Sequence, residues 1–497
     1  MQVDARAPRP GVGLPLARML TLVSAAVMLA SLWHHEPWSD ELNAWGLVLA
    51  SPTPFDLFHN LAYEGHPGLW HLMLWCASAF GDTVSTMKVV HGIIAIAVLI
   101  LIGLWFPLTM LERVLLLSNY YVIFEYSAIS RNYAIGLLLV LCYCRIYAMR
   151  QAAFTVQAVL LGLLANTNAF GLILSGILVT ERVARPVLKR AVRVQSLLPG
   201  MAGYGALLAI ATATILPAPD VSRPEARRAL SWASLSDLGN LWDALLHNVV
   251  TPFIPLTPAF PAGFSTPGLY WSPLQLWLAS AAVIPLTAAI TWVLRRDIWR
   301  LLLFAATLGS TVLFTHMVYS GSVRHWGITF VAFLAALWLA RTAGTARSSL
   351  VALLLAGGSL GGIEASVAGW LQPFSNVGPA ARWVMANSRP DERLIGYPDM
   401  QAGAVAITLH RSIYLLECAC DRTFVRLDKR RDDFNPAVSL VPGLLRAVAS
   451  GPALFISGVL IEGQIRADLD AAGLITTELA RFTGGERDRS LAVYRIR

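Results

Sequence analysis

Charged side chains are scarce in this chain. Asp, Glu, Lys and Arg make up 14% of its 497 residues, whereas soluble domains carry about 25%. Hydrophobic residues account for 56%, and the mean hydropathy is +0.59. This balance excludes an ordinary soluble globular protein and indicates a polytopic membrane protein.

Cysteine is also rare, and five cysteines do not make a disulfide framework. Cys142 and Cys144 lie in an apolar segment, where we expect them to pack against neighbouring helices. Cys418 and Cys420 lie in a polar C-terminal tail that we place outside the cytoplasm, where they can oxidise.

Acidic residues are few before the C-terminal tail. Positions 1 to 370 hold sixteen of them, and five of the sixteen lie between positions 34 and 66, in a polar loop flanked by apolar segments. These five are Glu36, Asp40, Glu41, Asp56 and Glu64. Carboxylates are costly at a membrane unless they serve a site, so this loop is the candidate active site.

The formal net charge is +8, but the distribution of the basic residues does not suggest a nucleic-acid partner. They fall in short clusters between apolar segments, a pattern that argues against nucleic-acid binding and marks cytoplasmic loops. The clusters are Arg182, Arg185, Lys189 and Arg190; Arg295, Arg296 and Arg300; and Arg341 with Arg347.

The first apolar run, residues 15 to 33, follows Arg6 and Arg9, contains Arg18 near its start, and resembles a signal peptide. A retained first helix is the favoured interpretation, because many apolar segments follow it. The flanking charges then place the N-terminus inside and the 34 to 66 loop outside.

About twelve apolar segments are expected up to residue 370, several of them shorter than the ~20 residues that a crossing needs. The basic loop at 182 to 190 implies that residues 125 to 131 lie outside, on the same side as the 34 to 66 loop. Two loops on the same side must be separated by an even number of crossings, but the sequence offers three apolar segments between them. One segment between 67 and 124 therefore either does not cross or is divided differently. The expected total is about 11 to 13 transmembrane helices.

Two further regions are expected outside the membrane. Residues 218 to 270 form a second outer loop rich in proline and aromatics, with an amphipathic stretch near 233 to 249 that suits the membrane surface. From about residue 375 the composition changes, and the tail holds fourteen of the thirty acidic residues.

The tail alternates helix-like and strand-like segments, which predicts a small α/β domain. The expected strands are 393 to 397, 412 to 416, 453 to 457 and 491 to 496. We therefore divide the chain into a transmembrane module, 1 to 374, and a soluble extracytoplasmic domain, 375 to 497.

Three short motifs occur in a specific order. Ser39-Asp40-Glu41 stands at the outer end of the first span, Glu64-Gly65-His66-Pro67 opens the next apolar segment, and Ser130-Arg131-Asn132-Tyr133 follows. Together they resemble the GT-C superfamily of integral membrane glycosyltransferases. The closest likeness is to the branch with the protein O-mannosyltransferases and the bacterial aminoarabinose transferases. One departure is Pro67-Gly68, where that branch has paired prolines.

The resemblance implies an inverting hexosyl- or pentosyltransferase in a bacterial inner membrane. Such enzymes take a sugar from a polyprenyl-phosphate carrier at the outer face of the membrane. The acceptor would be an envelope glycolipid, a lipid-linked glycan or a protein.

Transfer of this kind needs a base for the acceptor hydroxyl and cations for the phosphate leaving group. Asp40 is the expected general base, and Glu41 beside it is expected to orient the acceptor or to tune the base. The structural alternative is that Asp40 caps a helix from about 41 to 50.

The second motif supplies two candidate substrate-binding residues. His66 suits the carrier phosphate or the acceptor, or else anchors the interface, and Glu64 suits the acceptor or a basic partner. His34, His35 and Glu36 have no fixed metal-ligand spacing, so solvation at the interface is the favoured interpretation. A divalent metal, Mg or Mn, stays possible because some GT-C relatives use one.

Basic residues at two other outer helix ends are candidates for the phosphate. Arg131 is suited to grip phosphate oxygens, with an ion pair to Glu125 as the alternative. Arg324 and His325 repeat the arrangement, with snorkelling as the alternative. Tyr133 is expected to line the substrate groove, although aromatics are common at interfaces.

Two rival classes stay open. A transporter or flippase of lipid-linked sugars also needs outward basic residues, but it would want charged or broken helices near the bilayer midplane and internal repeats. A receptor anchored by the bundle would leave the Asp40 loop without a role.

Overall fold

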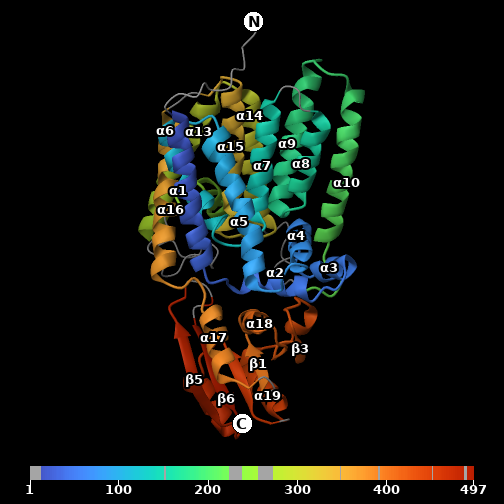
Figure 1. Cartoon of the computed structure of the whole chain (residues 1–497), viewed down its shortest axis with the longest axis vertical. Helices are drawn as coiled ribbons and strands as arrows, with labels where there is room; N and C mark the ends of the chain where they lie inside the picture. Colours follow the sequence, from blue (N-terminus) through green and yellow to red (C-terminus); the bar gives the residue numbers. More distant parts are fainter. Residues whose placement is uncertain are drawn as a thin grey trace.

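Helices form a long bundle, and a mixed sheet with its own helices lies at one end of it (Figure 1). Helix α1 (Gly13–His34) begins at the end of the bundle farthest from this C-terminal domain. The computed structural model describes residues 13–149, 153–222, 238–255, 273–346, 349–389, 392–449, 451–485, 488 and 490–497.

Seven helical segments in the described ranges are long and apolar enough to cross a membrane. They are α1, α5 with η1 (Val84–Trp105), η3 with α10 (Val194–Ile215), α13 (Pro273–Leu294), α14 (Ile298–Met317), α15 (Val323–Thr342) and α16 (Leu350–Leu371). Helix α15 is almost entirely buried among the others. The expected multi-pass helical fold is confirmed.

Shorter or more charged helices complete the bundle: α6 (Met110–Leu117), η2 (Tyr120–Glu125), α7 (Tyr133–Ala148), α8 (Phe154–Ala165) and α9 (Ala169–Leu188). Of the second outer loop, residues 223 to 237 and 256 to 270 lie outside the described residues. The described part of its amphipathic stretch is α12 (Leu238–Val249).

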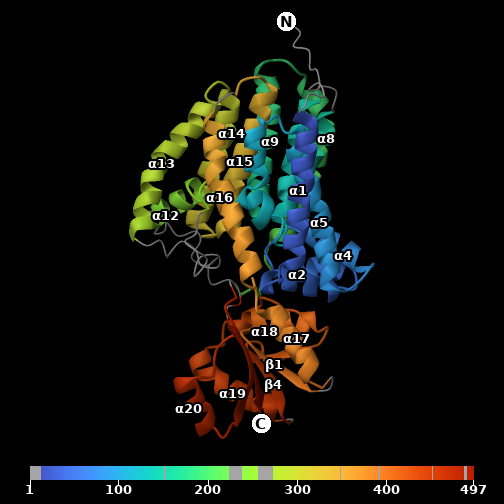
Figure 2. The ribbon, with the colours of Figure 1, turned by 60° about the vertical axis from the view of Figure 1, so that its left-hand side comes forward.

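Three short helices lie where the bundle meets the C-terminal domain: α2 (Ser39–Leu49), α3 (Pro54–Leu61) and α4 (Leu69–Ser78) (Figure 1; α2 and α4 also in Figure 2). Helix α4 has ten residues, which makes it about 15 Å long, half the thickness of the hydrocarbon core. It is too short to cross. Figure 1 places α4 beside α2 and α3, at the end of the bundle next to the C-terminal domain. Helix α4 is therefore the segment that accounts for the conflict in sidedness between 67 and 124.

The C-terminal domain contains a six-stranded sheet in the order β3-β2-β1-β4-β6-β5. The parallel strands are β1 (Arg393–Tyr397), β2 (Ile413–Leu415) and β4 (Ala453–Ser457). The antiparallel strands are β3 (Cys420–Arg422), β5 (Thr476–Thr483) and β6 (Ser490–Ile496). The α/β prediction holds, and β1 and β4 match their expected bounds.

Helices connect and cover these strands: α17 (Val377–Asn387), α18 (Asp399–Thr408), η4 (Lys429–Arg431), α19 (Pro436–Val448) and α20 (Gly463–Ala471). The expected boundary at 374/375 falls between α16 and α17. Helix α18 packs against α2, and Gly46 permits the close approach, because an added Cβ would lie 2.5 Å from Ile407 Cδ1.

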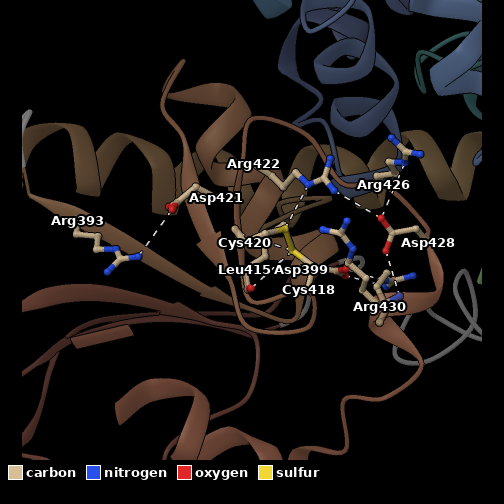
Figure 3. Close-up of a disulfide and its surroundings, with 11 residues drawn as sticks. Arg393, Asp399, Leu415, Cys418, Cys420, Asp421, Arg422, Arg426, Asp428 and Arg430 are labelled. Carbon is tan, nitrogen blue, oxygen red and sulfur yellow. Dashed lines mark hydrogen bonds and ion pairs between the residues drawn. A yellow bond between two sulfur atoms is a disulfide. The ribbon is translucent and has the colours of Figure 1, made fainter. Parts of the chain in front are cut away.

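Cys418 and Cys420 form a disulfide across a single intervening residue, as Figure 3 shows. Arg422 Nε lies 3.3 Å from Cys420 Sγ. Arg422 and Arg426 both reach toward Asp428, with N to O distances of 3.5 and 3.9 Å. A covalent link and ion pairs thus stiffen the segment that meets the membrane module.

Glu417, next to this disulfide, gives the C-terminal domain a pH-dependent stability. Its Oε1 accepts the Asp399 N–H at 2.7 Å, and Asp399 pairs with Arg431. Burial, and then the negative charge of Asp399, raise the pKa of Glu417 to about 7. Because this pKa lies above that of an unfolded chain, about 4.3, the fold loses stability as pH rises between the two values.

We therefore expect Glu417→Gln to raise the melting temperature at pH 8 by a few degrees, because it removes a buried negative charge. Below about pH 4, where Glu417 is protonated in both the folded and the unfolded chain, variant and wild type should melt together. Thermal unfolding of the full-length protein in lipid at pH 3.5 and pH 8 measures both differences. Equal melting temperatures at pH 8 would contradict the assignment.

Candidate active site

Asp40 faces two arginines that come from distant parts of the chain. Arg324 Nη2 lies 2.9 Å from Asp40 Oδ2, and Arg131 Nη1 lies 3.5 Å from the same oxygen. Arg131 Nη1 also donates to the Asp40 carbonyl oxygen at 2.6 Å. The Asp40 side chain keeps 24% of its surface exposed. The site is thus a carboxylate held between two guanidiniums and open on one side.

The start of α2 explains why Asp40 points this way. The helix begins at Ser39, so Asp40 lies in its first turn. Other carboxylates accept from the free N–H groups there: Glu41 from the Trp38 N–H at 3.2 Å, and Asp488 from the Ser39 N–H at 3.1 Å. The capping role expected as the alternative for Asp40 is therefore filled by these two residues.

Glu41 is completely buried, and each of its two carboxylate oxygens has a polar partner. His35 Nε2 lies 2.8 Å from Oε2, and the Ser130 N–H donates to Oε1 at 2.6 Å. Burial alone would raise the pKa of Glu41, but His35 and the hydrogen bonds from Ser130 and Trp38 outweigh it, so the pKa lies below its usual value. Glu41 fastens the 34 to 41 loop to the turn before Arg131.

We expect Glu41→Gln to lower the melting temperature by a few degrees. A glutamine has one acceptor oxygen where Glu41 has two, so a buried N–H loses its partner at a cost of about 1–3 kcal/mol. Because the Glu41 pKa is lowered in the fold, its stabilisation is present above the unfolded pKa and fades as pH falls through the folded pKa. Thermal unfolding beside Asp40→Asn tests this, and an unchanged melting temperature would speak against it.

The second motif lies next to α2. Asn43 Nδ2 donates to Glu64 Oε1 at 2.8 Å, and Asn43 Oδ1 accepts the Val425 N–H at 2.9 Å. His66 is partly buried and close enough to His71 and His325 to influence both electrostatically. Glu64 and His66 thus border the same region as Asp40.

Aromatic rings gather around His325 at the start of α15. Its ring centroid lies 5.6 Å from that of Tyr133 and 5.0 Å from that of Tyr319. The Ser322 N–H donates to His325 Nδ1 at 2.9 Å, which fixes the ring. Arg324 lies over the Trp38 ring, with Cζ 5.1 Å from its centroid. Aromatic surface therefore borders the charged groups.

The structure brings the predicted residues together in two sets. Asp40, Arg131 and Arg324 make direct contacts, whereas Tyr133 and His325 contact each other beside them. The alternative partner of Arg131, Glu125, accepts the Tyr120 hydroxyl at 2.6 Å. Within the ranges that the structure describes, no group of three or more His, Cys, Asp or Glu is placed to hold a metal ion.

Sequence reasoning missed His71. This imidazole is 3% exposed, and in the described part of the chain neither ring nitrogen has a hydrogen-bond partner. Burial, and then the charges of His66 and Arg131, lower its pKa to about 3, so the ring is neutral. The sequence offered one signal for His71, its position five residues after His66. It was not selected because a lone histidine in an apolar helix usually packs in the core.

The fold matches two solved structures along almost the whole chain. One is ArnT from Cupriavidus metallidurans bound to undecaprenyl phosphate, with 12% identity and a TM-score of 0.52. The other is the same protein in the apo state, with 11% identity and a TM-score of 0.54. Each match covers 97% of this chain and 98% of the other.

Comparisons by sequence alone found less. No protein-family model matches the chain, and no curated protein matches it. The structural likeness therefore shows that this chain has the fold of these two structures.

Proposed function

We propose that this chain, which has the fold of ArnT, is an inverting glycosyltransferase that takes its sugar from a polyprenyl-phosphate donor. The acceptor is a cell-envelope glycolipid, lipid-linked glycan or protein at the outer face of a bacterial inner membrane. The observation that carries the proposal is the Asp40 carboxylate between Arg131 and Arg324. The ArnT structure with undecaprenyl phosphate supports the choice of carrier.

In the proposed reaction, Asp40 accepts the proton of the acceptor hydroxyl as its oxygen attacks the anomeric carbon of the donor. The bond from that carbon to the phosphate oxygen breaks, and its electron pair leaves with the polyprenyl phosphate. One direct displacement inverts the anomeric configuration. General-base catalysis of this kind contributes about 10²- to 10⁴-fold to the rate.

Arg131 and Arg324 have two tasks in this scheme. Without substrate they pair with the Asp40 carboxylate and orient it. When the donor enters, the same guanidiniums meet the phosphate, whose negative charge grows as the sugar departs. Because this carboxylate and the incoming phosphate compete for the same cations, donor binding also frees Asp40 to act as a base.

The other residues have supporting roles. Glu64 and His66 bind the acceptor or the carrier phosphate, and Tyr133 and His325 line the groove for the sugar. Glu41 acts through the placement of Asp40 and the Ser130 turn. No step is assigned to a metal ion. The disulfide supports an extracytoplasmic C-terminal domain, because disulfides persist in oxidising compartments.

The test is a transfer assay with purified protein in lipid vesicles, a panel of polyprenyl-phosphate sugars and an extract of envelope acceptors. We expect one donor to lose its sugar to an acceptor and to yield free polyprenyl phosphate. Movement of intact donors between leaflets, with no loss of sugar from any of them, would replace the transferase by a flippase.

A further inference from the structure

Helix α2, which carries Asp40, has its N-terminus against the C-terminal domain. Asp488 lies between β5 and β6, 449 positions after Ser39, and is 8% exposed. Its Oδ2 accepts the Ser39 N–H at 3.1 Å and the Ser375 hydroxyl at 2.9 Å. Its Oδ1 accepts the Ser39 hydroxyl at 3.0 Å. The soluble domain thus supplies a cap to the helix of the candidate base.

Such a cap fixes a helix end. The first N–H groups of a helix lack partners within it, and a carboxylate satisfies them and interacts favourably with the helix dipole. Ser39 directly precedes Asp40, so the two bonds from Ser39 to Asp488 also limit rotation of the first turn. Burial raises the pKa of Asp488 against its hydrogen bonds to Ser375 and Ser39, which lower the pKa, and the charge of the nearby Asp40 adds to the rise.

Two further contacts of α2 with the C-terminal domain lie on the same helix face. Asn43 accepts the Val425 N–H at 2.9 Å, and Gly46 packs against Ile407. Residues 39, 43 and 46 are four and three positions apart, so they form one stripe along the helix. Asp40 is one position on, about 100° around the axis, and its carboxylate meets the two arginines.

We infer that Asp488 is a positioning residue for sugar transfer: the C-terminal domain, through its contacts with Ser39, Asn43 and Gly46, sets the orientation of α2 and so the direction of the Asp40 carboxylate. The inference rests on the proposed function of Asp40. It gives the C-terminal domain a role in the chemistry, although the domain contributes no group to the reacting atoms. A misplacement of about 1 Å can cost two orders of magnitude in rate.

The experiment compares the full-length variants Asp488→Ala, Asp488→Asn and Arg382→Ala in the transfer assay. Alanine removes the acceptors of Ser39, whereas asparagine keeps one acceptor oxygen. Arg382 is the matched control, because its ion pair with Glu36, at 2.8 Å, joins the C-terminal domain to the same loop without contacting α2.

We expect Asp488→Ala to lower kcat about tenfold while KM for the donor changes less than twofold, because the binding groups stay in place. Asp488→Asn should recover kcat to within about threefold of wild type, and Arg382→Ala should match wild type. Ser39→Ala removes one of the two bonds from Ser39 to Asp488 and should lower kcat by a smaller factor. It replaces Asp488→Ala as the test if that variant does not fold.

Three results would overturn the inference: wild-type kcat in Asp488→Ala, an equal loss in Arg382→Ala, or a rise in KM in place of a fall in kcat. If Asp488→Ala does not fold, unchanged kcat in Ser39→Ala decides against it. Failure of the proposed function looks different, because wild type and Asp40→Asn would then be alike. An active wild type, an inactive Asp40→Asn and an unaffected Asp488→Ala reject the positioning role alone.

Discussion

Asp40→Asn is expected to lower kcat for sugar transfer by about 10³-fold, within the range that a general base contributes. An amide keeps the size of the side chain but cannot take the acceptor's proton. Donor affinity should be unchanged or higher, because Arg131 and Arg324 lose a negative partner and remain available to the phosphate. Single-turnover transfer and the binding of undecaprenyl phosphate, both in lipid, measure the two effects separately.

Asp56→Asn is the matched control for this prediction. Asp56 is an exposed acid in the same 34 to 66 loop, and its carboxylate serves only the start of α3, where it accepts from Thr53. Its variant should retain transfer within about twofold, the effect of a weakened surface cap. Equal activity in Asp40→Asn and wild type would remove Asp40 from the chemistry, whatever else the protein does.

The second large effect concerns Arg324. Arg324→Gln should lower kcat/KM by about 10²- to 10³-fold, the usual cost of losing one group that stabilises charge in a transition state. It should also reduce the preference of the protein for polyprenyl phosphate over the uncharged polyprenol. Binding of both lipids and the transfer rate are the measurements.

Arg324→Lys separates charge from geometry. Lysine keeps a positive charge but cannot bind two oxygens in the planar arrangement of a guanidinium. We therefore expect it to recover phosphate preference and only part of kcat. Arg324→Gln with wild-type rate and preference would show that Arg324 merely pairs with Asp40.

The sequence identified the elements of the candidate site but not their pairing. Asp40 and Arg324 were predicted separately, as a base and as a phosphate ligand. Their contact spans 284 positions, and no local pattern encodes a contact of that separation. Periodicity predicts which residues form a helix, whereas tertiary packing decides which helix ends meet.

Capping was the harder part of the prediction. A carboxylate near a helix start is an ordinary cap, so Asp40 itself was the natural candidate. The structure gives that role to Glu41 and to Asp488, which lies in the C-terminal domain. Only the folded chain shows that the C-terminal domain reaches the helix of the candidate base.

The strands missed in the C-terminal domain have a related cause. β3 and β5 are the edges of the sheet, and their residues are polar and at least partly exposed. They lack the short apolar run that is typical of a buried strand, whereas β1 and β4 are buried along most of their length. Hydrophobic patterning therefore predicted the centre of the sheet and not its edges.

The most direct test of the central claim measures, in one reaction, the polyprenyl phosphate that is released and the glycosidic bond that is formed. A polyprenyl-phosphate sugar of known anomeric configuration is incubated with acceptor and with wild-type protein or Asp40→Asn in lipid. We expect wild type to release one polyprenyl phosphate for each new glycosidic bond, with inverted configuration, and Asp40→Asn to form neither product at a comparable rate. Retained configuration, equal rates in the two proteins, or an intact donor throughout would contradict the account.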